Sequence, residues 1–215
     1  MKISALALAA ALLIPTATLA GSGPLKTLAL GQDLFAYGQA QQDPVMVLSA
    51  AKITGSVFIE DVQRPTQTRP GAAPGTDDSA PADPTVVTAA QMYQIAYDLA
   101  EGDDALQARI EDASVEGSRG RIGGASRTLN RLQAGYIDMV RLEFEGGILA
   151  ELAILGNDGS NLDLKVLDEK GNTICREQGA SDKLYCAWTP TQNGVFFAEV
   201  ENVSSKRNSY YVLTN

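Results

Sequence analysis

The residues best suited to chemistry form a polar cluster in the second half of the chain. Asn157, Asp158, Asn161 and Asp163 place oxygen-bearing side chains at short spacing, and Asp168 follows them. Calcium takes six to eight oxygen ligands, so the pattern is compatible with a calcium site built from Asp158, Asn161 and Asp163. The EF-hand pattern is absent, and Asn, Asp, Gly and Ser are ordinary turn residues. We therefore favour a polar turn and expect no cofactor, with calcium as the alternative.

Most catalytic constellations are excluded by composition. The chain contains no histidine, which removes Ser-His-Asp and Cys-His catalysis and histidine-ligated metals. A pair of carboxylates remains available, because 26 acidic residues always offer some pair. Lys183 and Lys206 lie near serines on expected exposed loops, where a lysine lacks the desolvation that lowers its pKa. We expect no enzyme, with a carboxylate-dependent hydrolase as the remaining catalytic alternative.

Aromatic residues gather near the end of the sequence and offer a different chemistry. Phe197, Tyr210 and Tyr211 could stack on a sugar ring. In an adjacent pair such as Phe196 and Phe197, successive side chains of a strand point to opposite faces. Because aromatics dominate sandwich cores, we favour burial for most of them. A carbohydrate partner is therefore an alternative prediction.

Charge and the first residues of the sequence predict where the protein acts. A formal charge of -9 disfavours nucleic acid and anionic membrane surfaces as partners. Lys2, the apolar residues 5–14 and the small residues Thr18 and Ala20 are arranged like a signal peptide over residues 1–20. No later stretch has the length of a transmembrane helix. The sequence predicts a periplasmic or secreted protein without membrane insertion.

The two cysteines, Cys175 and Cys186, fit an exported protein. An even count in an oxidising compartment indicates a structural disulfide. Two thiols alone do not complete a zinc site, and their spacing is not that of a Cys-x-x-Cys redox motif. We expect the disulfide to join two neighbouring strands.

The residues from 21 to 117 predict a helical region. Helices are expected over residues 32–42, from Pro44 to about Gly55, from Thr88 to Gly102, and from Asp103 to 113. Asp43 and Asp103 have the position and type of helix N-caps. A short strand is expected over residues 56–62. Residues 63–84 are rich in proline and poor in apolar side chains, which predicts a disordered loop.

The residues from 118 to 215 predict a β-sandwich. Residues 116–131 form a glycine-rich basic connection carrying Arg119, Arg121, Arg127 and Arg131. We interpret it as a solvated linker whose arginines meet the acidic helices, with an anion site as the alternative. From Tyr136 onward the hydrophobic period is two. The predicted strands cover residues 136–145, 148–155, 162–167, 173–176, 184–188, 195–201 and 209–214. The predicted fold class is α+β: helical hairpins followed by an antiparallel, jelly-roll-like sandwich.

Several segments resemble a known family. Residues 161–172 (NLDLKVLDEKGN), residues 188–197 (WTPTQNGVFF) and the final YYVLTN resemble the bacterial pre-peptidase C-terminal domain over about residues 130–215. The resemblance implies a β-sandwich appended to secreted proteins, often proteases, as a non-catalytic accessory. No protease domain precedes it here. The expected function is a non-catalytic exported interaction module that contacts another envelope or secreted protein. The alternative is a carbohydrate-binding module, assisted by calcium.

Overall fold

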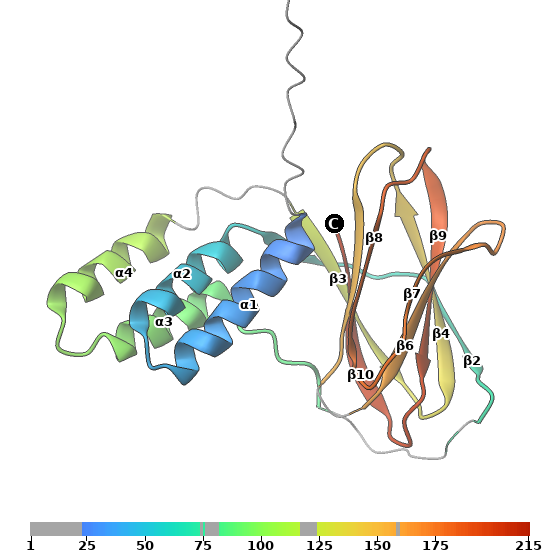
Figure 1. Cartoon of the computed structure of the whole chain (residues 1–215), viewed down its shortest axis with the longest axis horizontal. Helices are drawn as coiled ribbons and strands as arrows, with labels where there is room; N and C mark the ends of the chain where they lie inside the picture. Colours follow the sequence, from blue (N-terminus) through green and yellow to red (C-terminus); the bar gives the residue numbers. More distant parts are fainter. Residues whose placement is uncertain (1–22, 74, 76–81, 117–123, 158–159) are drawn as a thin grey trace, which may run out of the picture.

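The molecule consists of a helical bundle beside a β-sandwich, as Figure 1 shows. A computed structural model describes residues 23–73, 75, 82–116, 124–157 and 160–215. The predicted signal peptide lies outside this part, as do Arg119, Arg121 and Asp158. The predicted α+β class with a C-terminal sandwich is confirmed.

The first helical hairpin contains α1 (Pro24–Ala40) and α2 (Pro44–Gly55). α2 begins as predicted, because Asp43 accepts hydrogen bonds from the backbone N–H groups of Val45 (2.8 Å) and Met46 (3.0 Å). α1 begins at Pro24, well before the predicted start. A proline at the first helical position sets φ without losing a helical hydrogen bond.

The second hairpin contains α3 (Ala89–Leu99) and α4 (Asp104–Glu116). Thr88 and Gln91 form a capping box at the start of α3. Asp103 accepts from the backbone N–H of Leu106 at 3.0 Å, which confirms its predicted role as a cap. Over the residues that Figure 1 places with certainty, each helix is too short or too polar to cross a membrane.

The sandwich consists of two five-stranded sheets, here called sheet A and sheet B. Sheet A has, in spatial order, the strands β1 (Phe58–Asp61), β3 (Gly124–Leu132), β10 (Asn208–Thr214), β5 (Ala150–Leu155) and β8 (Lys183–Trp188). Sheet B has the strands β2 (Thr66–Pro70), β4 (Tyr136–Phe144), β9 (Gly194–Asn202), β6 (Leu162–Asp168) and β7 (Thr173–Glu177). The pairs are antiparallel except β1 with β3, which is parallel.

Alternation along the strands builds the core between the sheets. In β6, for example, Leu162, Leu164 and Val166 are buried, whereas Asp163 and Lys165 are partly exposed. Side chains of a strand alternate between faces, so one apolar face per sheet is enough to fill the interior. The period-two prediction from Tyr136 onward is confirmed in β4, β6, β8 and β9, whereas β5 and β10 are buried at nearly every position and β7 is mostly exposed.

Two segments that we predicted to be irregular form strands instead. Within residues 63–84, Thr66–Pro70 pairs with β4 as an edge strand, so the prediction of disorder is wrong there. All its residues are at least partly exposed, and its polar composition is therefore compatible with a sheet. Residues 76–81 lie outside the described residues.

Within the predicted basic linker, β3 pairs with β10 and β1. We had expected its two arginines to meet the acidic helices, and they do not. Arg127 forms an ion pair with Asp61 of β1 at 2.6 Å, and Arg131 one with Asp83 at 2.8 Å. Asp61 lies on the neighbouring strand and Asp83 in the segment before α3, so both arginines bond carboxylates that are not on a helix.

The predicted disulfide is present between Cys175 and Cys186, with a Cα–Cα distance of 6.1 Å. Cys175 belongs to β7 of sheet B and Cys186 to β8 of sheet A. The two strands are neighbours in sequence, as predicted, and they belong to different sheets rather than pairing by hydrogen bonds. The bond joins the edge strands of the two sheets and holds one side of the sandwich closed.

The helical bundle is fixed to the sandwich at the start of α1. The carboxylate of Glu151 in β5 is fully buried, and it accepts from the backbone N–H groups of Leu25 (3.1 Å) and Lys26 (3.3 Å). The hydroxyl of Tyr185 donates to the same carboxylate at 2.6 Å. A negative charge at a helix N-terminus is favourable and satisfies free N–H groups. The helical bundle therefore contacts sheet A through a specific polar contact surrounded by apolar side chains.

Candidate functional site

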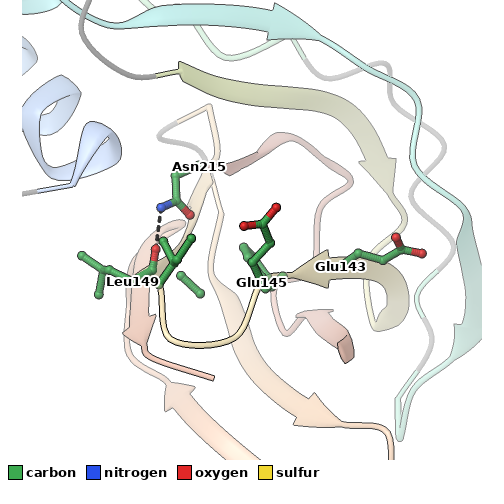
Figure 2. Close-up of a pocket in the computed structure, with 7 residues that line it drawn as sticks. Glu143, Glu145, Leu149 and Asn215 are labelled. Atoms are coloured by element: carbon green, nitrogen blue, oxygen red, sulfur yellow. Dashed lines mark hydrogen bonds between the residues drawn. The ribbon is translucent and has the colours of Figure 1, made fainter. Parts of the chain in front are cut away.

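A surface hollow lies at the end of the sandwich that carries the last residue, here called the Asn215 end. It occupies about 320 Å³. The hollow is lined by side chains from the end of β4, the β4–β5 turn, the start of β5 and the chain terminus: Glu143, Phe144, Glu145, Ile148, Leu149, Ala150 and Asn215. Figure 2 shows these seven residues, with Glu143 on β4, Glu145 just after the strand ends, and Leu149 beside Asn215.

The β4–β5 turn is held in place by three hydrogen bonds. The backbone N–H of Gly146 donates to Oδ1 of Asn193 at 2.9 Å, and that of Gly147 donates to the carbonyl of Pro190 at 2.7 Å. Nδ2 of Asn215 donates to the carbonyl of Leu149 at 2.7 Å, the dashed line in Figure 2. The turn is thus tied to the β8–β9 loop and to the chain terminus.

Two glycines allow the backbone conformation of this turn. A Cβ on Gly146 would lie 2.3 Å from Cα of Gln192, so only glycine allows the close approach to the β8–β9 loop. Gly147 has a φ of 76°, in the left-handed region that side chains disfavour. The turn therefore has one defined shape, and it presents the next two residues outward.

Those two residues are apolar and exposed. Ile148 is 55% exposed and Leu149 38% exposed. Adjacent exposed aliphatic side chains on a fixed turn are not required by the fold, since the core is complete without them. Exposed apolar side chains grouped around a hollow are typical of a contact surface for another molecule.

The rim of the hollow is acidic. Glu143 and Glu145 are both exposed. Glu143 forms an ion pair with Arg141 at 2.6 Å, and its side chain remains 69% exposed. The hollow therefore combines aliphatic contact area with negative charge, which suits an apolar group that lies next to a positive one.

Beneath the hollow is a packed aromatic cluster. The ring of Phe144 lies edge-on to Trp188 (4.9 Å between centroids) and to Phe196 (5.9 Å). Trp188 is partly buried and packs against the core between the sheets. Its indole N–H is buried and has no hydrogen-bond partner among the described residues. The cluster gives the hollow a rigid floor.

The three predicted sugar-stacking aromatics do not form one surface. Tyr210 is fully buried, so its predicted exposure is wrong: its side chain faces the core and donates a hydrogen bond to Oδ2 of Asp138 at 2.6 Å. Burial raises the pKa of both Tyr210 and Asp138. Phe197 and Tyr211 are partly exposed, on the outer faces of sheet B and sheet A respectively. The guanidinium of Arg127 lies 4.9 Å from the Tyr211 ring centroid.

The predicted calcium ligands are separated from one another. Asp163 accepts a hydrogen bond from Nε2 of Gln178 at 3.0 Å on the outer face of sheet B. Oδ1 of Asn161 is buried, and Asp158 lies outside the described residues. Within the described ranges no three acidic or thiol side chains are grouped as metal ligands. Calcium at this loop stays a prediction.

Sequence reasoning missed the hollow because it assigned Ile148 and Leu149 to a strand. β5 begins at Ala150, and both residues belong to the turn. The signal that could have revealed them is the pair Gly146-Gly147 directly before two aliphatic residues. A turn signal followed by apolar residues indicates side chains presented at a loop rather than on a sheet face.

Comparison with known proteins gives neighbours in fold only. No family model matches the chain, and a search of curated proteins finds no significant match. A pre-peptidase C-terminal domain of a Bacillus anthracis collagenase is 9% identical, with a TM-score of 0.29 over 42% of this chain and 74% of that chain. A mutant lectin-binding domain of lectinolysin complexed with Lewis b is 11% identical, with a TM-score of 0.30 over 40% and 70% of the two chains. The lectin domain of lectinolysin complexed with Lewis B antigen is 15% identical, with a TM-score of 0.27 over the same shares. The family predicted from the sequence motifs is thus among the neighbours, over about 40% of the chain.

Proposed function

We propose that the protein is a non-catalytic binding module that acts in the periplasm or outside the cell and contacts another envelope or secreted protein through the hollow at the Asn215 end. The observation that carries the proposal is the fixed β4–β5 turn, which exposes Ile148 and Leu149 beside Glu143 and Glu145. The disulfide is compatible with an oxidising compartment.

The shape of the turn favours binding because it is already ordered. Association costs the entropy of ordering side chains and loops, and a preorganised surface avoids part of that cost. Gly146 and Gly147 and the bonds to Asn193, Pro190 and Asn215 hold the turn before any partner arrives. A partner that inserts an aliphatic side chain next to a lysine or arginine matches both the apolar walls and the acidic rim.

The test compares two surface variants in one capture experiment. Tagged wild-type protein, the double variant Ile148→Ser/Leu149→Ser and the control Val203→Ser are mixed with envelope extract from the source cells. Val203 is 44% exposed in the β9–β10 loop, at the other end of the sandwich. We expect one protein to be captured by the wild type and by Val203→Ser, and its purified form to bind the double variant at least tenfold more weakly.

Two outcomes would contradict this proposal. If the purified partner binds the double variant as tightly as the wild type, the hollow is not the contact surface. If the protein hydrolyses a glycoside and Glu145→Gln abolishes that activity, the carboxylate hydrolase replaces the binding module.

A carbohydrate-binding module remains the second candidate, on the observation that Phe197 is partly exposed on the open face of sheet B. It pairs with Arg141 in register, so the two side chains project from the same face of the sheet. A glycan that binds the wild type and not Phe197→Ala would favour this candidate, with Ile148→Ser/Leu149→Ser as the control that should keep binding.

A further inference from the structure

The loop between β8 and β9 ends in an asparagine that precedes a glycine. Asn193 is directly followed by Gly194, and no other asparagine of the sequence is followed by a glycine. Glycine has no Cβ, so it leaves its own backbone nitrogen open to the side chain of the residue before it. That nitrogen can attack the side-chain amide of an asparagine and close a five-membered ring. The pair therefore has the chemistry of a spontaneous modification site.

The structure leaves the amide of Asn193 accessible and polarised. The residue is exposed and lies just before β9 begins at Gly194. Its Oδ1 accepts the hydrogen bond from the backbone N–H of Gly146 at 2.9 Å. A donor on this oxygen stabilises the negative charge that develops there when a nucleophile adds to Cγ, as backbone donors do in an oxyanion hole. The contact that holds the β4–β5 turn therefore also favours attack on the amide.

The attacking nitrogen belongs to the end of a strand ladder. Gly194 forms the last pair of β9 with β4, opposite Phe144. The end of a ladder opens more easily than its middle, because the pairs behind it stay closed. The fold itself does not require glycine here: the φ of Gly194 is outside the left-handed region, and an added Cβ would lie 3.7 Å from its nearest neighbour, Cε2 of Phe196. An alanine at this position therefore fits without displacing other atoms.

We propose that Asn193 converts spontaneously to isoaspartate and that this conversion loosens the β4–β5 turn. The deprotonated nitrogen of Gly194 attacks Cγ of Asn193, the bond from Cγ to Nδ2 breaks, and the amide leaves as ammonia. Water then opens the ring. Opening at the side-chain carbonyl gives aspartate, and opening at the backbone carbonyl gives isoaspartate, whose backbone is longer by one carbon. Water is the single co-reactant, and no atom is oxidised or reduced.

A longer backbone at residue 193 disturbs the contacts that fix the turn. The β8–β9 loop supplies the acceptors for two of its three hydrogen bonds, those from Gly146 and Gly147. The loop also packs tightly on the turn, since a Cβ on Gly146 would lie 2.3 Å from Cα of Gln192. Because close-packed segments transmit strain, a displaced loop displaces the turn. The loss of partner binding that follows rests on the proposed function, whereas the conversion does not.

The test incubates the purified folded protein, with its disulfide intact, at neutral and at mildly alkaline pH. Peptide mass mapping locates the conversion, and enzymatic methylation specific for isoaspartate identifies the product. We expect residue 193 to convert faster than any other asparagine, at a rate that rises with pH because the attacking nitrogen must lose its proton. Gly194→Ala should slow the conversion by about a factor of ten or more, because the added Cβ crowds that nitrogen.

Hydrogen exchange of the Gly146 amide then reports on the turn without any partner. We expect exchange about tenfold faster in the converted wild type. It should be unchanged in incubated Gly194→Ala and in Asn193→Asp, which has the charge of the product on a backbone of normal length. The proposal is overturned if Asn193 stays intact in the folded chain, or if its conversion leaves exchange at Gly146 unchanged. Failure to capture an envelope partner would contradict the proposed function alone, since neither readout involves a partner.

Discussion

The two ends of the β-sandwich are closed by different chemistry. At the Asn215 end the space between the sheets is filled by the rings of Phe144, Trp188 and Phe196. At the other end, here called the Asn208 end, the corresponding space holds the polar side chains of Asp182 and Asn208, and Tyr210 with Asp138 lies next to them. The sandwich thus has packed aromatic rings between its sheets at one end and a polar network at the other.

The two ends differ in what their buried side chains need in order to be stable. The rings at the Asn215 end pack by shape, although the indole N–H of Trp188 has no hydrogen-bond partner among the described residues, and the turn above them exposes Ile148 and Leu149. A polar network is stable only when every member is satisfied, and at the Asn208 end Oδ1 of Asn208 has no partner in the described part of the chain. The first end therefore depends on the fit of its rings, and the second on the hydrogen bonds of its polar side chains.

The largest expected effect on the free energy of unfolding comes from the aromatic rings at the Asn215 end. Phe196→Ala should lower the free energy of unfolding by about 4 kcal/mol, because it removes a buried ring that packs against two others. Urea unfolding measures the change. The neighbouring Phe197→Ala is the control: its side chain lies on the outer face and is partly exposed, so the loss should be about 1 kcal/mol. Equal losses for the two variants would show that the rings do not close this end.

A smaller effect is expected where the helical bundle joins the Asn215 end. Glu151→Ala should cost about 3 kcal/mol, because it leaves the N–H groups at the start of α1 and the Tyr185 hydroxyl without their acceptor. Tyr185→Phe removes one donor and should cost about 1 kcal/mol. Differential scanning calorimetry checks the result. A Glu151→Ala protein as stable as the wild type would show that this carboxylate does not fix the helical bundle to the sandwich.

The smallest effect concerns pH and the polar network. Burial raises the pKa of Asp138 above its ordinary value of 3.8. The folded chain therefore holds this proton more tightly than the unfolded chain. The resulting stability is fully present below the unfolded pKa and is lost as the pH rises through the folded pKa.

Asp138→Asn removes this titration while keeping an acceptor for Tyr210. We expect the wild type to gain stability relative to the variant as the pH is lowered from 7 toward 4, measured by urea unfolding at each pH. Glu143→Gln, an exposed carboxylate at the Asn215 end, serves as the control with no such trend. Parallel curves for the wild type and Asp138→Asn would contradict the assignment.

Local signals in the sequence were sufficient where the structure depends on neighbouring residues. Asp43 and Asp103 cap helices, Gly171 takes a positive φ of 83° in the β6–β7 turn, and β4, β6, β8 and β9 follow the period-two pattern. Each of these features arises within a few residues, so the residue types alone carry the information. The polar edge strand β2 was missed because its stability comes from pairing with β4, far along the chain.

What the sequence by itself determined is the α+β class, the starts of α2, α3 and α4, the strand-rich C-terminal part and the two cysteines that bond. The tertiary structure alone decided that the disulfide joins two sheets, that Glu151 receives the start of α1, and that Tyr210 faces the core. It also decided which residues meet at each end: Ile148 with Asn215, and Asp182 with Asn208. The physical reason is that caps, turns and periodicity act over a few residues, whereas closure of a sandwich joins segments distant in the sequence whose contacts no local pattern encodes.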